Sequence, residues 1–332
     1  MTMNTRMTPI VVAIAAALTL TLPAAALAQA APEAKSVKPG AAAPKKAPAK
    51  QRTFATPEDA AKALVDAVRA SDAKALVDIV GPGSRTWIFT GDDVSDANEW
   101  KQFVAAYDAK NALMKEGDAR AVLQIGTDPV PFAAPIVKRG DAWAFDAEAG
   151  REEVTNRRVG RNELDTIQTL LAIVDAQREY AAKDADGNGL ADYAARFVST
   201  PGKKDGLYWE TKPGEPASPL GPLAAKAVKE GYGGKRKDSS PVPYNGYYFR
   251  MLTAGQGGFA PGGKHDYLVK GKLFGGFAVV AYPARYGVSG VMSFLVNHDG
   301  VVYEADLGKD TAGVAGKLTR FDPDKRWKKA PQ

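Results

Sequence analysis

Apolar positions first recur at helical spacing a few residues after position 53. Thr56 and Pro57, followed by two acidic residues, are typical of a helix N-terminus. The spacing predicts a helix from residue 57, a second over 72–80 and a third over 98–113. Short runs of β-forming residues predict three strands in the next segment, at residues 119–125, 135–138 and 142–146.

The longest helical pattern in the chain covers residues 162–182, with its apolar residues on one side. A short helix over 193–198 and a loop-rich stretch over 199–244 are expected after it. The C-terminal part has only strand signals, separated by glycine-rich turns, at residues 246–252, 266–269, 276–282, 290–297 and 301–305. The last two strands should form a hairpin, because Asp299-Gly300 supplies the positive φ of a tight turn.

This order of elements predicts an α+β protein with two units. In residues 53–155, N-terminal helices pack on a small antiparallel sheet. In residues 156–328, a long helix is followed by an acidic loop and a C-terminal antiparallel sheet. The second arrangement is similar to the globular heads of type IV pilins, although here the long helix is amphipathic and internal.

The first 28 residues have the order of a secretory signal peptide. Arg6 precedes an apolar run over 10–22, and small residues end in Ala26-Leu27-Ala28. We expect cleavage after Ala28, which predicts a periplasmic or extracellular protein. The alternative is a membrane anchor, but the apolar run is shorter than the roughly 20 residues that a spanning helix needs.

The chain contains no cysteine. Disulfides, a lipid-modified N-terminus, thiol catalysis and zinc held by cysteine are therefore excluded. No later stretch reaches membrane-spanning length, so no transmembrane segment is expected after processing.

The formal charge of +6 belongs to the N-terminal region rather than to the fold. Once Arg6 and the net five positive charges of residues 31–52 are removed, residues 53–332 are neutral. Nucleic-acid binding is not expected, because it normally requires a basic patch on the folded domain. Residues 29–52, rich in Ala, Pro and Lys, are interpreted as a flexible linker, with weak adhesion to anionic envelope polymers as the alternative.

Several motifs along residues 53–328 resemble those of the bacterial family of exported proteins catalogued as domain of unknown function 2950. The matching segments are 157–163, 175–180, 205–209, 218–223, 246–250, 275–278, 286–292 and 306–308. Residues 126–132 depart from the family pattern, because they lack its tryptophan. The resemblance implies an exported bacterial protein and indicates no activity.

The strongest chemical motif is an acidic loop between two predicted helices. Its oxygen ligands have the spacing of an EF-hand calcium loop: Asp184, Asp186, Asn188, the Leu190 carbonyl and Asp192. Position twelve, where a bidentate Glu is expected, is Ala195. Weak Ca2+ binding is one interpretation, and an ordinary turn rich in Asp, Asn and Gly is the other.

Candidates for catalysis are few, and they are all carboxylates. Glu163, Asp205 and Glu210 could serve a hydrolase that acts on envelope glycan or peptide. The alternative is that Glu163 belongs to a structural ion pair. The aromatic residues Tyr208, Trp209, Tyr247 and Tyr248 could form a ligand-binding surface or fill the core beneath a loop.

We therefore expect a non-catalytic binding or scaffolding module of the bacterial envelope, with stabilisation by Ca2+ if the acidic loop binds it. Its partner would be an envelope polymer or another protein. The alternative is a carboxylate-dependent hydrolase.

Overall fold

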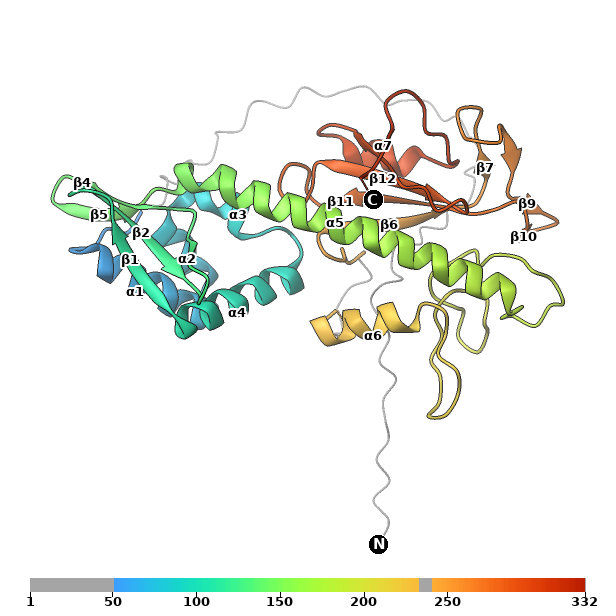
Figure 1. Cartoon of the computed structure of the whole chain (residues 1–332), viewed down its shortest axis with the longest axis horizontal. Coiled ribbons are helices and arrows are strands. Elements are labelled where there is room, and N and C mark those ends of the chain that lie inside the picture. The colour runs from blue at the N-terminus through green and yellow to red at the C-terminus, as the bar shows by residue number, and fades with distance from the viewer. Residues whose placement is uncertain (1–50, 233–240, 332) are drawn as a thin grey trace, which may run out of the picture.

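The computed structural model describes residues 51–232 and 241–331, and it shows two units connected by one long helix (Figure 1). The predicted signal peptide lies outside the described residues, as does all of the predicted linker except its last two residues. The α+β prediction is confirmed: helices and a small sheet come first, then the long helix, then antiparallel sheets. Within the two described ranges, none of the helices combines the length and the apolar character that crossing a membrane requires.

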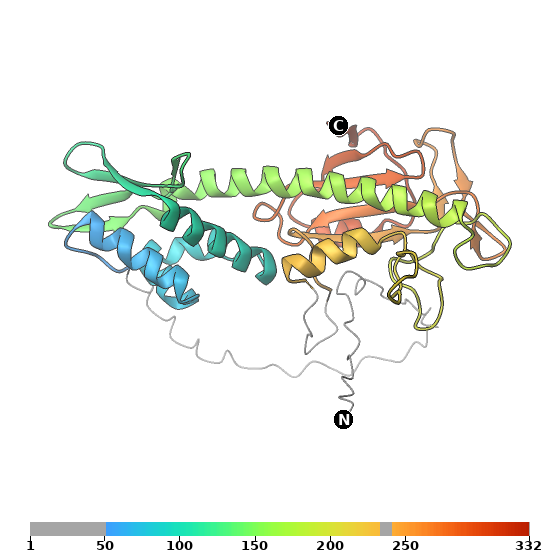
Figure 2. The ribbon, with the colours of Figure 1, turned by 60° about the horizontal axis from the view of Figure 1, so that its bottom comes forward.

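The N-terminal unit packs its helices against a small antiparallel sheet (Figure 2). The helical elements are α1 (Pro57–Arg69), α2 (Ala73–Val80), the 3-10 turn η2 (Pro82–Ser84), α3 (Arg85–Ile88) and α4 (Asp93–Ala109). The strands are β1 (Asn111–Lys115), β2 (Arg120–Ile125), β3 (Val130–Pro131), β4 (Ile136–Arg139) and β5 (Ala142–Phe145). They follow the order β1-β2-β4-β5, and β3 pairs with β2. Leu64, Ile79, Ile136 and Phe145 share one buried core.

Helix α5 (Ala147–Ala182) has 36 residues and connects the two units. At about 1.5 Å per residue it is about 54 Å long. Ile167, Leu170, Ile173 and Val174 in its second half are buried against the C-terminal sheet. Its first half runs back towards the N-terminal unit (Figure 1).

The C-terminal unit is built on a five-stranded antiparallel sheet in the order β14-β13-β12-β11-β6. The strands are β6 (Tyr247–Leu252), β11 (Ala278–Pro283), β12 (Met292–Asn297), β13 (Tyr303–Asp306) and β14 (Lys328–Lys329). Alternate residues face opposite sides, as the pleat requires. Val279 and Phe294 join the core beside α5, whereas Val280 and Leu295 join a second core that includes α7 (Thr311–Lys317).

The remaining elements surround this sheet. Helix α6 (Gly221–Glu230) lies beneath α5 (Figure 2). Two small hairpins lie at the end of the molecule farthest from the N-terminal sheet (Figure 1). They pair β7 (Gly255–Gln256) with β8 (His265–Asp266), and β9 (Leu268–Val269) with β10 (Lys272–Leu273).

The predicted third helix is wrong at both ends. Helix α4 begins at Asp93, because the Asp92 side chain caps it by accepting a hydrogen bond from the Ser95 N–H. It ends at Ala109, where the Asn111 side-chain amide donates to the Tyr107 carbonyl. The residues assigned to its last turn instead form β1, an edge strand paired with β2.

The long helix begins at residue 147 rather than 162, and it therefore passes through residue 155. Its first turns were missed because residues 151–157 are mostly charged and show no apolar period. The Asp146 side chain caps the helix by accepting from the Ala149 N–H.

The predicted short helix over 193–198 is wrong. Backbone groups there have partners that compete with a helix. The Gln177 side chain both donates to the carbonyl of Ala194 and accepts from its N–H. Tyr193 forms a bridge with Leu273, and Val198 forms one with Tyr208. The stretch after it also differs from the prediction, because it contains α6, which has Pro222 in its first turn and is followed by Gly231 in the left-handed conformation.

Candidate functional site

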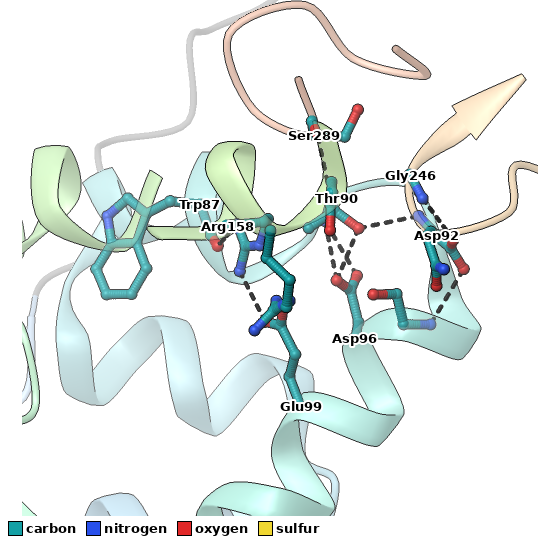
Figure 3. Close-up of polar contacts among 12 residues, drawn as sticks. Trp87, Thr90, Asp92, Asp96, Glu99, Arg158, Gly246 and Ser289 are labelled. Atoms are coloured by element: carbon teal, nitrogen blue, oxygen red, sulfur yellow. Dashed lines mark hydrogen bonds and ion pairs between the residues drawn. The ribbon is translucent and has the colours of Figure 1, made fainter. Parts of the chain in front are cut away.

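A group of buried polar side chains lies where the N-terminal unit meets α5 and the C-terminal sheet (Figure 3). We call this group the polar junction. It consists of Thr90, Asp92, Asp96, Glu99, Arg158, Asn162, Tyr232 and Arg285, with the backbone of Trp87, Phe89, Gly246 and Ser289.

Asp92 is the centre of the polar junction, and its side chain is buried. One carboxylate oxygen accepts the N-cap hydrogen bond from Ser95. The other accepts from the Tyr232 hydroxyl at 2.8 Å and from the Gly246 N–H at 3.0 Å. Burial raises the pKa of Asp92, although these hydrogen bonds act in the opposite direction. A single carboxylate thus joins three segments that are far apart in the sequence.

Asp96 lies one turn further along α4, and it is only 4% exposed. Its carboxylate accepts from both the backbone N–H and the hydroxyl of Thr90. Burial raises the pKa of Asp96 to about 6, and the Thr90 hydrogen bonds and the charge of Arg158 only partly offset this effect.

Arg158 connects α5 to the polar junction. Its guanidinium donates to the Trp87 carbonyl at 2.6 Å and pairs with Glu99 at 3.0 Å. Arg161, one turn later, contacts the other oxygen of Glu99. Because the Arg158 side chain is almost fully buried, loss of its partner would leave an unpaired charge in the interior.

Two further contacts tie the C-terminal sheet to the rest. The Asn162 side-chain amide donates to the Ser289 carbonyl at 2.9 Å. Arg285, just after β11, donates to the Phe89 carbonyl in the N-terminal unit. The polar junction therefore fixes the two units and α5 against one another.

A carboxyl group with a pKa near 6 lies in the range that suits a general base. Asp96, however, has both oxygens bonded to Thr90 and almost no exposed surface. The geometry therefore favours a structural role for this acid.

The raised pKa of Asp96 predicts a pH dependence of stability. In the folded state Asp96 stays protonated up to about pH 6, whereas in the unfolded state it loses its proton near the ordinary pKa of an aspartate. Stability should therefore fall as the pH rises from about 4 to about 6. In urea unfolding, the advantage of wild type over Asp96→Asn should shrink by about 2 kcal/mol between pH 4 and pH 7. The exposed Asp93→Asn is the control, and an advantage independent of pH would contradict the prediction.

Two of the three candidate catalytic carboxylates have local hydrogen-bond partners, and the third is exposed. Glu163, on α5, accepts the N–H groups of Val291 and Met292 through one oxygen. Burial acts to raise the pKa of Asp205, but two hydrogen bonds from Thr200 and the charge of Arg196 together hold it below the ordinary value. Glu210 is exposed.

One acidic neighbour of Glu163 was missed from the sequence. Glu304 on β13 has a raised pKa, first because of burial and second because of the negative charge of Glu163. No spacing in the sequence connects these residues, since the sheet brings them together from 141 positions apart.

The aromatic candidates do not share one surface. Tyr247 is 0% exposed, and its hydroxyl donates to the Met292 carbonyl within the core beside α5. Tyr208 and Trp209 are partly buried against the same core, and Lys204 lies over the Trp209 ring. Tyr248 is half-buried and packs against Tyr282.

The acidic loop forms a compact turn closed by its own side chains. Asp184 accepts the N–H groups of Asn188 and Gly189. The Asn188 side-chain amide donates to Asp186 and Asp192. The Lys272 ammonium, from β10, lies 2.9 Å from Asp186 and 3.5 Å from Asp192.

A lysine thus occupies the position between the two carboxylates where a cation would bind. The described residues contain no group of three or more His, Cys, Asp or Glu side chains close enough to hold a metal ion. Calcium binding by the loop stays a prediction, and it would require Lys272 to move away.

The N-terminal unit also has an open groove of about 630 Å³ beside α1. Its lining is mixed, with Phe54 and Ile79 next to Arg52 and Asp59. None of the site residues predicted from the sequence lines this groove.

Comparison with known protein families identifies a family that matches most of the chain. A family described as a protein of unknown function, DUF2950, matches residues 51–330, which is the family predicted from the motifs. No curated protein and no solved structure matches the chain.

Proposed function

We propose, since the chain belongs to the DUF2950 family of proteins of unknown function, that it is a non-catalytic module of the bacterial envelope. In this role it holds two units at a fixed spacing and binds an envelope polymer or a protein partner.

The observation that carries the proposal is the use of buried charge in the polar junction. Asp92 accepts hydrogen bonds from α4, from Tyr232 and from the turn before β6. Arg158 and Glu99 connect α5 to the N-terminal unit in the same way. Buried charges that are paired across segments are suited to fixing geometry, because separating the segments would leave these charges without their partners.

The carboxylates considered for hydrolysis support the same conclusion. A glycosidase needs two carboxyl groups that face each other across the substrate. Glu163 and Asp205 instead accept hydrogen bonds from their own surroundings, and Glu210 lies exposed in a loop.

Export is part of the proposal and rests on the sequence. The pattern that ends at Ala28 is typical of a cleaved secretory signal, and a chain without cysteine suits an oxidising compartment.

The experiment uses protein recovered from the periplasm, whose N-terminus mass spectrometry should place at Gln29. Incubated with purified peptidoglycan sacculi or with whole envelope extract, it should be recovered in a bound state without release of soluble fragments. Release that is lost in Glu163→Gln or Asp205→Asn would favour the hydrolase. An intact Met1 on cytosolic protein would refute export.

We further propose that calcium competes with Lys272 at the acidic loop. The loop retains the ligand order of a calcium site, and the ammonium group neutralises the same carboxylates that calcium would use. Millimolar Ca2+ should raise the Tm of wild type slightly and that of Lys272→Gln by several degrees more. Lys270→Gln, two residues away, should behave as wild type. If neither wild type nor Lys272→Gln responds to Ca2+, the loop is a structural turn.

A further inference from the structure

The β9–β10 hairpin is an unusual part of the surface. Its strands pair Leu268 with Leu273 and Val269 with Lys272 around a two-residue turn. Lys270 and Gly271 have φ values of 50° and 81°, the left-handed conformation of a tight type I′ hairpin turn. Figure 1 places this hairpin at one extreme end of the molecule.

Apolar side chains are exposed on both faces of this hairpin. Leu268 and Val269 are 44% and 49% exposed, although successive residues of a strand point to opposite faces. Phe274, directly after β10, is 42% exposed. Phe259, in the loop that joins β7 to β8, is 70% exposed. Neither face of the hairpin is thus fully covered by the rest of the fold.

The segment that contains this hairpin has a net positive charge of its own, although the acidic loop lies beside it and contacts Lys272. Residues 257–275 contain three lysines and one aspartate. The aspartate, Asp266, pairs with Arg320, and Lys272 pairs with the acidic loop. Lys264 and Lys270 are exposed, and neither has an ion pair or hydrogen bond within the described part of the chain.

We propose that the β9–β10 hairpin docks the protein onto an anionic lipid surface. Leu268, Val269 and Phe274 enter the boundary between headgroups and acyl chains, and Lys270 at the turn contacts lipid phosphate. Exposed apolar residues combined with uncompensated lysines fit this partner, because lipid offers apolar and negative layers a few ångströms apart. The hairpin lies at one end of an elongated molecule, where it can reach a flat surface.

An anionic polysaccharide fits less well, since it offers charge without an apolar layer. A protein partner would fit the apolar residues but gives no reason for unpaired lysines beside them. The inference rests on the proposed export, which places the chain near a membrane, and it names the surface that such a module would bind.

The test is flotation of the mature chain with vesicles of phosphatidylglycerol mixed with phosphatidylethanolamine, and with vesicles of phosphatidylcholine alone. The protein should float with the anionic vesicles and not with the neutral ones. Val269→Asp should weaken binding about tenfold, through the lost burial of one apolar side chain. Lys270→Gln should weaken it about fivefold and reduce its salt dependence.

Val130→Asp is the matched control, because Val130 is 48% exposed on β3 in the N-terminal sheet, at the opposite end of the molecule. It should bind as wild type does. Absence of flotation with anionic vesicles, or equal binding by Val269→Asp and wild type, would overturn the inference. Hairpin-dependent capture of a protein or a polysaccharide without lipid binding would overturn it too. None of these results would alter the sacculus experiment, so the two proposals fail separately.

Discussion

Replacement of Asp92 by alanine should destabilise the protein by about 3 kcal/mol, because two buried donors lose their acceptor and α4 loses its cap. The Tyr232 hydroxyl and the Gly246 N–H both donate to this carboxylate. Asp92→Asn keeps one acceptor oxygen and should have a smaller effect. Urea unfolding followed by circular dichroism gives the free energy of each variant.

The adjacent Asp93 provides the control, since it is exposed. Asp93→Ala should change stability by no more than about 0.5 kcal/mol. Because the polar junction couples the two units, Asp92→Ala should also make unfolding less cooperative, with a lower m-value. If Asp92→Ala unfolds as Asp93→Ala does, the junction does not hold the units together.

The same glycine-to-alanine change should have opposite effects at two positions of α5. A Cβ at Gly150 would lie 2.7 Å from the Ala134 Cα and 2.8 Å from its backbone nitrogen, so the backbone would have to shift. Gly150→Ala should therefore destabilise by about 2 kcal/mol. A Cβ at Gly160 would meet nothing within 4 Å. Gly160→Ala should stabilise by about 0.5–1 kcal/mol, because alanine is the better helix former.

Thermal unfolding of the two single variants checks this pair, and each serves as the control for the other. Equal shifts in Tm for Gly150→Ala and Gly160→Ala would mean that α5 lies farther from Ala134 than the structure shows.

Local signals predicted much of the fold. The cap at Thr56 and the Asp299-Gly300 turn both depend on residues a few positions apart, and each was identified. The first half of α5 was missed, because a helix with charged residues on most sides has no apolar stripe to reveal it. The strand β1 was missed because its helical neighbour ends at a side-chain cap that no periodicity records.

The polar junction lay beyond sequence reasoning for a different reason. Asp92 is the kind of residue that caps a helix, and its side chain does cap α4. Its other partners, Tyr232 and Gly246, are 140 and 154 positions away, and a single sequence contains no signal that connects them. Lys272 likewise reaches the acidic loop from 86 positions away. The sequence therefore indicated the loop but not the lysine ammonium that pairs with its carboxylates.

These long separations in sequence bear on how the chain reaches its native state. The acceptor on Asp92 is in place early in the chain, yet its donors arrive only with the segment that leads into β6. Closing so large a loop costs conformational entropy, and this cost is offset only when the contacts of the sheet form. Folding is therefore slow. Until residues 232–246 have joined the fold, the Asp92 carboxylate stays hydrated, so the contact between the two units can be completed only late in folding.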